Sequence, residues 1–388
     1  MSHPKSAARW LGRRPERVPE FRQCWRVMPE LRGTLFRPTS YQLPLSPSPA
    51  PNMTDQTENP ASEKRVKKPL RCRRHGQMAK WLERTGGTLA ITTYTSGKLV
   101  FVGANNGRLM FQDHRFARPM GIALNGKRLA LAVREQILTY HLATDEVGKT
   151  TLMPGPTYHT GKVNAHDIAF GRRGIYFANT RFNGLARVSQ HKRFVHCWLP
   201  PFISTVVQED RCHLNGLGMQ AGEPTLATAF CETDERHDWR KEDRFTSGVL
   251  LDIPHHKIVA RGLCMPHSPR RYRGKWWLCN SGHGALTEFD PSLGTCREVC
   301  SLPGFTRGLC FVGNYALVGL SKIRPKHILD APPVRDRHEK LIAGVALVNL
   351  STGKAEGYLE FVEGGNEVFD VVFLRGIKEP GMCEQGEP

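Results

Sequence analysis

The chain has 388 residues, of which 39% are hydrophobic, enough apolar side chains for the core of one large domain. Its formal net charge is +19, and residues 1–85 carry +11 of it, from 18 Lys/Arg against 7 Asp/Glu. The sequence has no apolar stretch of about 18 residues, so we expect no membrane-spanning helix and no membrane partner. Its 11 cysteines form no CxxC pair, a usage typical of a reducing compartment, and we expect a cytoplasmic protein.

Residues 1–80 are predicted to form a disordered basic arm rich in Pro and Ser, within which Pro44–Pro51 reads PLSPSPAP. We hypothesise that translation starts at Met53, so that residues 1–52 are not translated. A basic arm attracts nucleic acid or anionic lipid non-specifically, but a solvated tail is the simpler interpretation. The folded part has no interleaving of aromatic and basic residues, so we expect no nucleic-acid partner.

Residues 81–376 are predicted to fold as one all-β domain. Short apolar runs alternate with turns that contain Gly, Asn or Asp. One phrase recurs six times: a small or acidic residue, an apolar strand, a tight turn and a second apolar strand. Its aligned positions are 121, 167, 216, 268, 308 and 370, separated by 46, 49, 52, 40 and 62 residues. Spacing of about 40–50 residues is typical of propeller blades. We therefore predict a six-bladed β-propeller with four antiparallel strands in each blade, followed by a flexible tail at 377–388.

The two ends of this domain are predicted to complete one blade. Three strands at Thr88–Tyr94, Lys98–Gly103 and Arg108–Phe111 have no innermost strand before them. The last repeat, Glu367–Phe373, is an innermost strand with no strands after it. Pairing the C-terminal strand with the N-terminal three closes the ring and leaves no open sheet edge between the termini.

One face of the propeller is predicted to carry a polar mouth. In each blade the innermost strand starts, and the second strand ends, on the same face near the axis, because the two strands are antiparallel. The innermost strands start with His166, Asp167, His213, Asn215, His267, Ser268, Arg307 and Glu367. The second strands end with Asn179, Glu232, Asn280, Ser321 and Lys322.

Three interpretations of this mouth remain open. In the first, His166, His213 and His267, with Glu367 as a fourth ligand, bind a divalent transition metal, because neutral imidazole suits such ions. In the second, the pocket is free of metal and uses histidine as acid or base. In the third, the histidines are structural. The candidate catalytic residues are His166, Asp167, His213, His267 and Arg307. The candidate ligand-binding residues are Asn179, Asn215, Glu232, Arg240, Ser268, Arg270, Asn280, Ser321 and Lys322.

Four phrases of the chain resemble those of a bacterial family known only as conserved hypothetical proteins with a domain of unknown function. They are Asp210–Gly216 (DRCHLNG), Pro266–Arg270 (PHSPR), Asn280–Gly282 (NSG) and Pro303–Gly308 (PGFTRG). The resemblance covers residues 80–376. It implies a propeller related in shape to NHL-type and gluconolactonase-like propellers, and it implies no reaction.

Related propellers add chemical analogies to this resemblance. The gluconolactonase-like group uses a divalent cation held by carboxylate and Asn, roles that Glu367, Asn215 and Asn280 would take here. The virginiamycin-lyase type is a propeller with a catalytic His and a divalent metal, and is similar in its chemistry to the histidine mouth. Both are analogies at the level of the fold.

We expect either of two functions. The first is a metal-assisted hydrolase, lyase or oxidoreductase acting on a small molecule or peptide in the axial pocket. The alternative is a non-catalytic propeller that binds a ligand or a protein partner. The sequence has no GxGxxG, Walker loop, HExxH or GxSxG motif, so nucleotide-binding and serine-hydrolase mechanisms lack their signatures.

Overall fold

The computed structural model describes residues 70–240, 242–323 and 332–383. Residues 1–69, with most of the predicted arm and the hypothesised start at Met53, lie outside the described residues.

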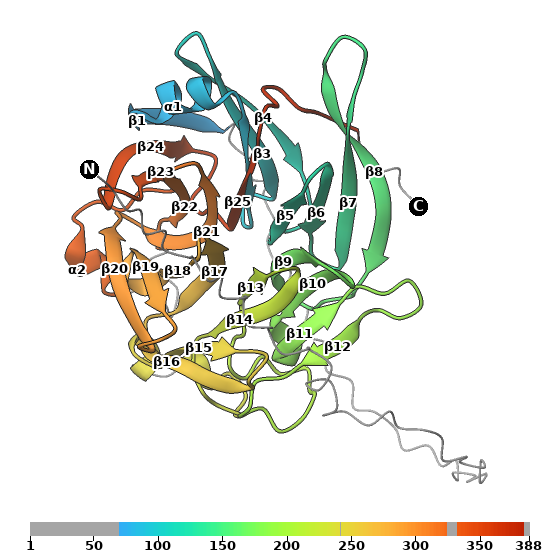
Figure 1. Ribbon diagram of the computed structural model, residues 1–388, viewed down its shortest axis with the longest axis vertical. Coiled ribbons are helices and arrows are strands. Elements are labelled where there is room, and N and C mark those ends of the chain that lie inside the picture. The colour runs from blue at the N-terminus through green and yellow to red at the C-terminus, as the bar shows by residue number, and fades with distance from the viewer. Residues whose placement is uncertain (1–69, 241, 324–331, 384–388) are drawn as a thin grey trace, which may run out of the picture. The chain divides into compact units, whose positions relative to one another are not determined.

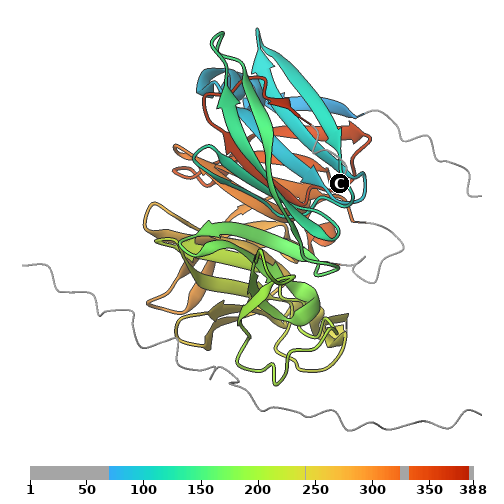
Figure 2. The ribbon, with the colours of Figure 1, turned by 90° about the vertical axis from the view of Figure 1, so that its right-hand side faces the viewer.

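The strands form six sheets around one axis, as predicted (Figure 1). Figure 2 shows this ring of blades from its side. We number the blades in chain order. Blade 1 has β25 (Asp370–Leu374), β2 (Thr88–Thr93), β3 (Lys98–Asn105) and β4 (Arg108–Arg115). Blade 2 has β5 (Ile122–Asn125), β6 (Arg128–Ala132), β7 (Gln136–Thr144) and β8 (Thr150–His159). Blade 3 has β9 (Ala165–Gly171), β10 (Gly174–Asn179), β11 (Gly184–Arg187) and β12 (Val195–Trp198).

Blades 4 to 6 repeat the same order from the axis outward. Blade 4 has β13 (Gly216–Gln220), β14 (Glu223–Ala229), β15 (Gly248–Asp252) and β16 (Lys257–Leu263). Blade 5 has β17 (Pro266–Tyr272), β18 (Lys275–Asn280), β19 (Ala285–Asp290) and β20 (Thr295–Ser301). Blade 6 has β21 (Phe305–Val312), β22 (Tyr315–Ser321), β23 (Gly344–Asn349) and β24 (Lys354–Glu363). Short helices interrupt the loops: η1 (Thr180–Phe182), η2 (Asp238–Arg240), η3 (Glu242–Phe245), η4 (Ser281–His283) and α2 (Val334–Arg337).

The predicted closure of the ring is confirmed. In blade 1, β25 pairs antiparallel with β2, and the register places Thr88 opposite Leu374 and Thr92 opposite Asp370. Since β2 continues into β3 and β4, the C-terminal strand completes a blade whose other strands come from the N-terminal side.

The ordered structure extends beyond both predicted domain boundaries. Before residue 81, β1 (Arg71–Gly76) pairs with β24 as a fifth strand of blade 6, and α1 (Met78–Thr85) follows it. After residue 376, β26 (Gly381–Met382) pairs in parallel with β8 of blade 2. The basic β1 lies at an exposed edge and shows no apolar alternation, so no pattern in the sequence indicated it. The segment before blade 1 thus pairs with blade 6, and the segment after β25 of blade 1 pairs with blade 2.

Adjacent blades pack face to face through buried aliphatic and aromatic side chains. Between blades 2 and 3, for example, Ile137 contacts a cluster that contains Ile168 and Phe177. The pairing register also confirms the geometry assumed for the mouth, with Ala165 opposite Asn179 and Pro266 opposite Asn280. Within the parts of the chain that the structure describes, no helix has the length and apolarity to cross a bilayer.

Candidate functional site: the axial mouth

Two rings of residues surround the axis where the innermost strands begin. The first ring, in order from blade 1 to blade 6, contains Phe369, Met120, His166, Asn215, His267 and Arg307. The second ring contains the residue that follows each of these: Asp370, Gly121, Asp167, Gly216, Ser268 and Gly308. In the second ring, a hydrogen-bonding side chain alternates with glycine.

The polar members of the second ring join the blades in pairs, blade 1 to blade 2, blade 3 to blade 4 and blade 5 to blade 6. Asp370 accepts a hydrogen bond from the backbone N–H of Ile122 at 3.1 Å, and Asp167 accepts one from Leu217 at 3.0 Å. Ser268 accepts the corresponding bond from the backbone N–H of Gly308 at 3.0 Å. The ring is therefore joined at three equivalent junctions.

Glycine is required at the alternate positions because the neighbouring blade leaves no room for a side chain. A Cβ on Gly121 would lie 3.1 Å from the Cα of Asp167, and one on Gly308 would lie 2.6 Å from the Cα of Asp370. A Cβ on Gly216 would lie 3.1 Å from the backbone nitrogen of Ser268. The close approach of neighbouring backbones therefore accounts for glycine at these three positions of the repeat.

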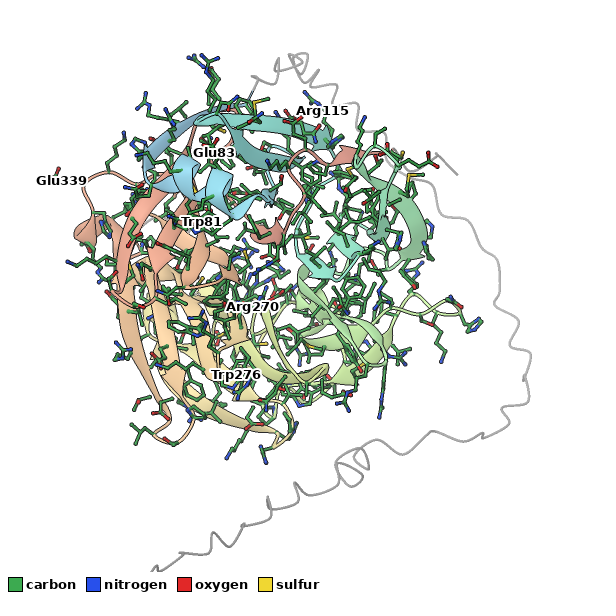
Figure 3. The ribbon with its side chains drawn as sticks, turned by 45° about the horizontal axis from the view of Figure 1, so that its top comes forward. Trp81, Glu83, Arg115, Arg270, Trp276 and Glu339 are labelled. Carbon is green, nitrogen blue, oxygen red and sulfur yellow. The ribbon has the colours of Figure 1, made fainter. Side chains whose placement is uncertain are left out.

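A buried ion cluster closes the axis beside the second ring. Arg270 of β17 lies near the centre of the ring of blades (Figure 3) and donates to both oxygens of Asp167, at 2.7 and 2.9 Å. The Asp370 carboxylate lies 3.8 Å from the same guanidinium. Burial and the neighbouring Asp167 raise the pKa of Asp370 to about 7, although Arg270 acts in the opposite direction. Burial alone would lower the pKa of Arg270, but Asp167 and Asp370 raise it above its ordinary value.

His166 and His267 are held in the same way in blades 3 and 5. Nδ1 of His166 lies 3.0 Å from the carbonyl oxygen of Asn164 and 2.7 Å from Oγ1 of Thr180. Nδ1 of His267 lies 3.0 Å from the carbonyl oxygen of Met265 and 2.9 Å from the Ser281 hydroxyl. In each blade the hydroxyl residue follows its histidine by 14 positions.

These contacts determine which ring nitrogen carries the proton. A carbonyl oxygen can only accept, so Nδ1 of His166 and of His267 must donate, and Nε2 then carries the free lone pair when the ring is neutral. Burial, followed by the charges of His213 and Arg307, lowers the pKa of His166 well below its ordinary value of 6.5. Burial and then Arg307 lower the pKa of His267 likewise. Both rings are therefore neutral at pH 7, with an unprotonated Nε2.

His213 joins this group from the loop before β13. Its Nδ1 lies 3.1 Å from both oxygens of Asp210, so its Nε2 is also the nitrogen that the blade leaves free. Its ring centroid lies 4.9 Å from that of His166 and 4.2 Å from that of Trp239. Phe230 lies between His213 and His267, with centroids 4.5 and 5.2 Å away. The three imidazoles thus belong to one layer of aromatic rings.

Arg307 is the charged residue of the first ring. Its Cζ lies 3.3 Å above the centroid of the Phe369 ring, a cation–π contact. Its Nη2 is buried and has no hydrogen-bond partner among the described residues. Burial lowers the pKa of Arg307 to about 10, although Glu367 and Asp370 act in the opposite direction. The side chain is therefore still charged at pH 7.

Several predicted ligand-binding residues are engaged within the protein. Asn215 accepts from Thr228 at 2.7 Å, and Asn280 accepts from the backbone of Cys264 at 2.7 Å. Ser321 exchanges hydrogen bonds with the backbone of Val368 at 3.1 Å.

Three other predicted ligand-binding residues differ from these in their contacts. Glu232 forms a bidentate ion pair with Arg261 of the outermost strand of blade 4, which turns it away from the axis. Arg240 stacks 4.0 Å from the ring of Trp239. Asn179 is fully buried, and neither its oxygen nor its nitrogen has a partner among the described residues.

The predicted metal ligands do not converge on one point. Among the described residues, no three His, Cys, Asp or Glu side chains lie close enough together to hold a metal ion. Glu367, the expected fourth ligand, accepts a hydrogen bond from the backbone N–H of Thr95 at 3.0 Å. The anchoring of Nδ1 by a hydrogen bond is the arrangement that metal-binding histidines usually have. The metal centre stays a prediction.

The structure adds residues that the sequence did not single out. Thr180 and Ser281 follow their histidines at equal spacing, a signal that alignment of the repeats would have revealed. Asp370 stands at an aligned repeat position, three residues after Glu367, the residue predicted as a metal ligand. The aromatic contacts of Phe230 and Trp239 had no signal, because the loop conformation decides them.

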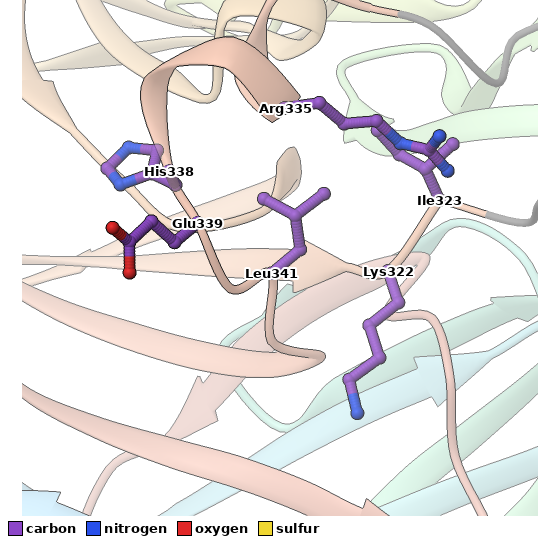
Figure 4. Close-up of a pocket in the computed structure, with 6 residues that line it drawn as sticks. All are labelled: Lys322, Ile323, Arg335, His338, Glu339 and Leu341. Atoms are coloured by element: carbon purple, nitrogen blue, oxygen red, sulfur yellow. The ribbon is translucent and has the colours of Figure 1, made fainter.

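A cavity of about 410 Å³ lies at the end of β22 in blade 6. Lys322, predicted to bind ligand, lines it with Ile323, Arg335, His338, Glu339 and Leu341, the six residues in Figure 4. Nε2 of His338 lies 2.9 Å from the hydroxyl of Ser301. This cavity shares no lining residue with the histidine layer, so the two are separate features of the blade ends.

Comparison with known proteins gives a family but no activity. The profile of the family described as "Domain of unknown function (DUF4915)" matches residues 76–383. No curated protein matches the chain. A solved structure titled "Crystal structure of Nidogen/Laminin Complex" is similar at 9% identity and a TM-score of 0.46, covering 75% of this chain and 100% of that one. A protein of unknown function from Bacteroides caccae is similar at 8% identity and a TM-score of 0.46, covering 75% and 99%. Identities this low carry no information about function.

Proposed function

The chain belongs to the DUF4915 family of domains of unknown function, and we propose that its axial mouth binds a small molecule on which His166 and His267 act as general bases. The observation that carries this proposal is the anchoring of each Nδ1 by a backbone carbonyl, at 3.0 Å in both blades. This contact leaves an unprotonated Nε2 on a neutral ring, the form that a general base requires.

The chemistry that follows is proton transfer. An unprotonated Nε2 removes a proton from a bound hydroxyl group or from water, and the resulting imidazolium can return it to a leaving group. The reaction class is therefore that of a hydrolase or lyase. Asp210 gives His213 the same orientation, so His213 is the third candidate base. The metal-assisted version of the reaction requires the three rings to bind one ion, and among the described residues no group of three His, Cys, Asp or Glu side chains is arranged to hold one.

Nuclear magnetic resonance of protein labelled with ¹⁵N-histidine tests the protonation states. We expect two rings to keep a protonated Nδ1 and an unprotonated Nε2 from pH 8 to below pH 6.5, and His166→Gln and His267→Gln to remove their signals one at a time. Titration of both rings near their ordinary pKa of about 6.5 would overturn the proposal.

A turnover assay tests the role itself. The purified full chain is incubated with a mixture of small esters, lactones and peptides, and mass spectrometry follows their loss. We expect His166→Gln and His267→Gln to abolish any conversion. The matched control is His255→Gln, because Nδ1 of His255 is likewise held by a hydrogen-bond acceptor, the carboxylate of Asp252, but the side chain is exposed at the rim.

Non-catalytic binding is the second candidate function, favoured by the aromatic rings around the histidines. Phe305 lies 5.6 Å from His267 and Phe369 lies 5.4 Å from His166 between ring centroids. Aromatic side chains that line a pocket bind a ligand without reacting with it. Saturable binding of a compound that stays chemically unchanged, and that the His→Gln variants still bind, would favour this candidate. A cytoplasmic location belongs with either proposal and rests on the cysteine usage alone.

A further inference from the structure

We infer that the mouth binds the carboxylate group of its ligand through Arg307, so that the ligand is a small carboxylic acid with an apolar or aromatic body. The inference rests on the proposed small-molecule site and names its ligand class. Four observations carry it: the position of Arg307, its unpartnered nitrogen, the occupation of the neighbouring carboxylates, and the aromatic surroundings.

The backbone brings Arg307 into the first ring by a local irregularity. The register of β21 against β22 shifts between Thr306 and Leu309, and Gly308 within this bulge has φ +79°. A positive φ of this kind favours glycine, so the bulge is encoded at that residue. The guanidinium carbon then lies 3.3 Å from the centroid of the Phe369 ring, and a guanidinium on an aromatic ring can still donate its N–H groups to a ligand.

Nη2 of Arg307 is a buried donor that the described protein does not satisfy. Leaving a buried donor on a charged group unpaired is costly, and structures normally avoid it. The contrast with Arg270 is direct, because Arg270 lies on the same axis and has both oxygens of Asp167 as acceptors. Among the described residues, Arg270 therefore has a carboxylate as its direct partner, whereas Nη2 of Arg307 has no hydrogen-bond partner.

The nearby carboxylates have other contacts. Asp167 is paired with Arg270, and Asp370 accepts from the backbone N–H groups of Ile122 and Val371. Glu367 accepts from the backbone of Thr95. Among the described residues, these three carboxylates therefore bond to groups other than Arg307, and a ligand supplies the acceptor for its Nη2. The planar fork of arginine matches the two oxygens of a carboxylate.

The surroundings favour an apolar body over a second charge. Phe369 lies against Arg307, and Phe305 and Phe230 contact the ring of His267. His166 and His267 are neutral and Arg307 is the charged residue of the first ring, which suits a carboxylate better than a doubly charged phosphate. Trp239 adds a buried indole N–H without a partner among the described residues, a second donor for an oxygen of the ligand.

Binding of simple probes to the full chain tests the inference. Benzoate and phenylacetate are titrated against benzamide, which has the same body without the charge, and against inorganic phosphate. We expect saturable binding of the carboxylates, followed by tryptophan fluorescence and by a rise in Tm. Equal binding of benzamide, or binding of phosphate without binding of either carboxylate, would overturn it.

Substitution at Arg307 locates the site. We expect Arg307→Gln to weaken carboxylate binding at least about tenfold, since it removes a charge-assisted bidentate contact, and Arg307→Lys to weaken it less. Arg271→Gln is the matched control, because Arg271 also stacks on an aromatic ring, Trp276, at 5.6 Å, but is exposed. Unchanged affinity in Arg307→Gln, or an equal loss in Arg271→Gln, would contradict the assignment.

Two further measurements separate this inference from the rest. We expect the Tm of unliganded Arg307→Met to equal or exceed that of the unsubstituted protein, because the substitution removes a buried charged donor, Nη2, that has no hydrogen-bond partner among the described residues. A large fall in Tm would assign Arg307 a role in the fold instead. His166→Gln should keep carboxylate binding while losing turnover. If Arg307→Gln loses carboxylate binding while the histidines titrate near their ordinary pKa of about 6.5, the general bases are refuted and the carboxylate site is supported. If the histidines stay neutral below about pH 6.5 while Arg307→Gln binds carboxylates as before, only the carboxylate site is refuted.

Discussion

Replacing Arg270 by methionine tests the ion cluster that closes the axis. The substitution keeps the length of the side chain but leaves the carboxylates of Asp167 and Asp370 without their cation. Asp167 has 4% of its side chain exposed, and Arg270 has 23%. Removing one partner of a buried pair costs about 3–5 kcal/mol, and the partial exposure of Arg270 places the expected loss of unfolding free energy near the lower limit, about 3 kcal/mol at pH 8.

The pH dependence of this loss distinguishes an ion cluster from simple packing. In the variant, the two buried carboxylates take up a proton more readily than they do in the unfolded chain. The folded state then binds more protons than the unfolded state between about pH 4 and pH 7, so stability falls as the pH rises through that range. We therefore expect a smaller loss at pH 5 than at pH 8.

Urea unfolding at pH 5 and pH 8 measures both quantities. Arg271→Met is the control, because Arg271 is the next residue of β17 and is exposed, so its loss should stay within about 0.5 kcal/mol at either pH. An equal loss for Arg270→Met at the two pH values would refute the electrostatic account, and so would an equal loss in the control.

Three other predictions concern the same axis. Because the pKa of Asp370 is raised to about 7, the folded state holds a proton that the unfolded chain releases near pH 3.8, and the stability that this group contributes is lost as the pH rises toward 7. An asparagine at this position cannot titrate, so urea unfolding should show that the free energy of unfolding of Asp370→Asn, relative to the unsubstituted protein, increases between pH 5 and pH 8. Gly216→Ala places a Cβ against Thr228, Pro269 and Ser268 and should cost about 1–3 kcal/mol in the same assay, whereas unchanged stability would show that the second ring is not closely packed. Mass spectrometry of the purified protein should find less than about a tenth of an equivalent of any transition metal; near-stoichiometric metal that His166→Ala removes would establish the metal centre instead.

The sequence by itself determined the blades and the closure of the ring. Strands within a blade are neighbours in the chain, so apolar runs and turn residues reveal them, and the repeat positions 121 to 370 set their number. The same repeat predicted that His166 and His267 would occupy equivalent places, because it aligns the starts of their strands. That part of the site follows from local order.

Contacts between blades required the tertiary structure. Arg270 meets Asp167 across 103 positions of the chain, and Asp370 meets the backbone of Ile122 across 248. The repeat spacing predicts that such residues lie at equivalent positions along the axis, but it does not predict which side chains contact each other. The sequence therefore identified both acidic repeat positions without predicting that one arginine would pair with them.

What the sequence determined is the polar mouth with its histidines, and what only the tertiary structure decided is the state of those histidines. The proton on Nδ1 of His166 depends on the carbonyl of Asn164, and the neutrality of the ring depends on its burial and on Arg307. Likewise, only the structure shows that Nη2 of Arg307 has no hydrogen-bond partner among the described residues, while Asp167 bonds to Arg270. The sequence specifies which residue types are present. Their protonation states and partners depend on the fold, because the fold decides which groups lie within hydrogen-bonding distance.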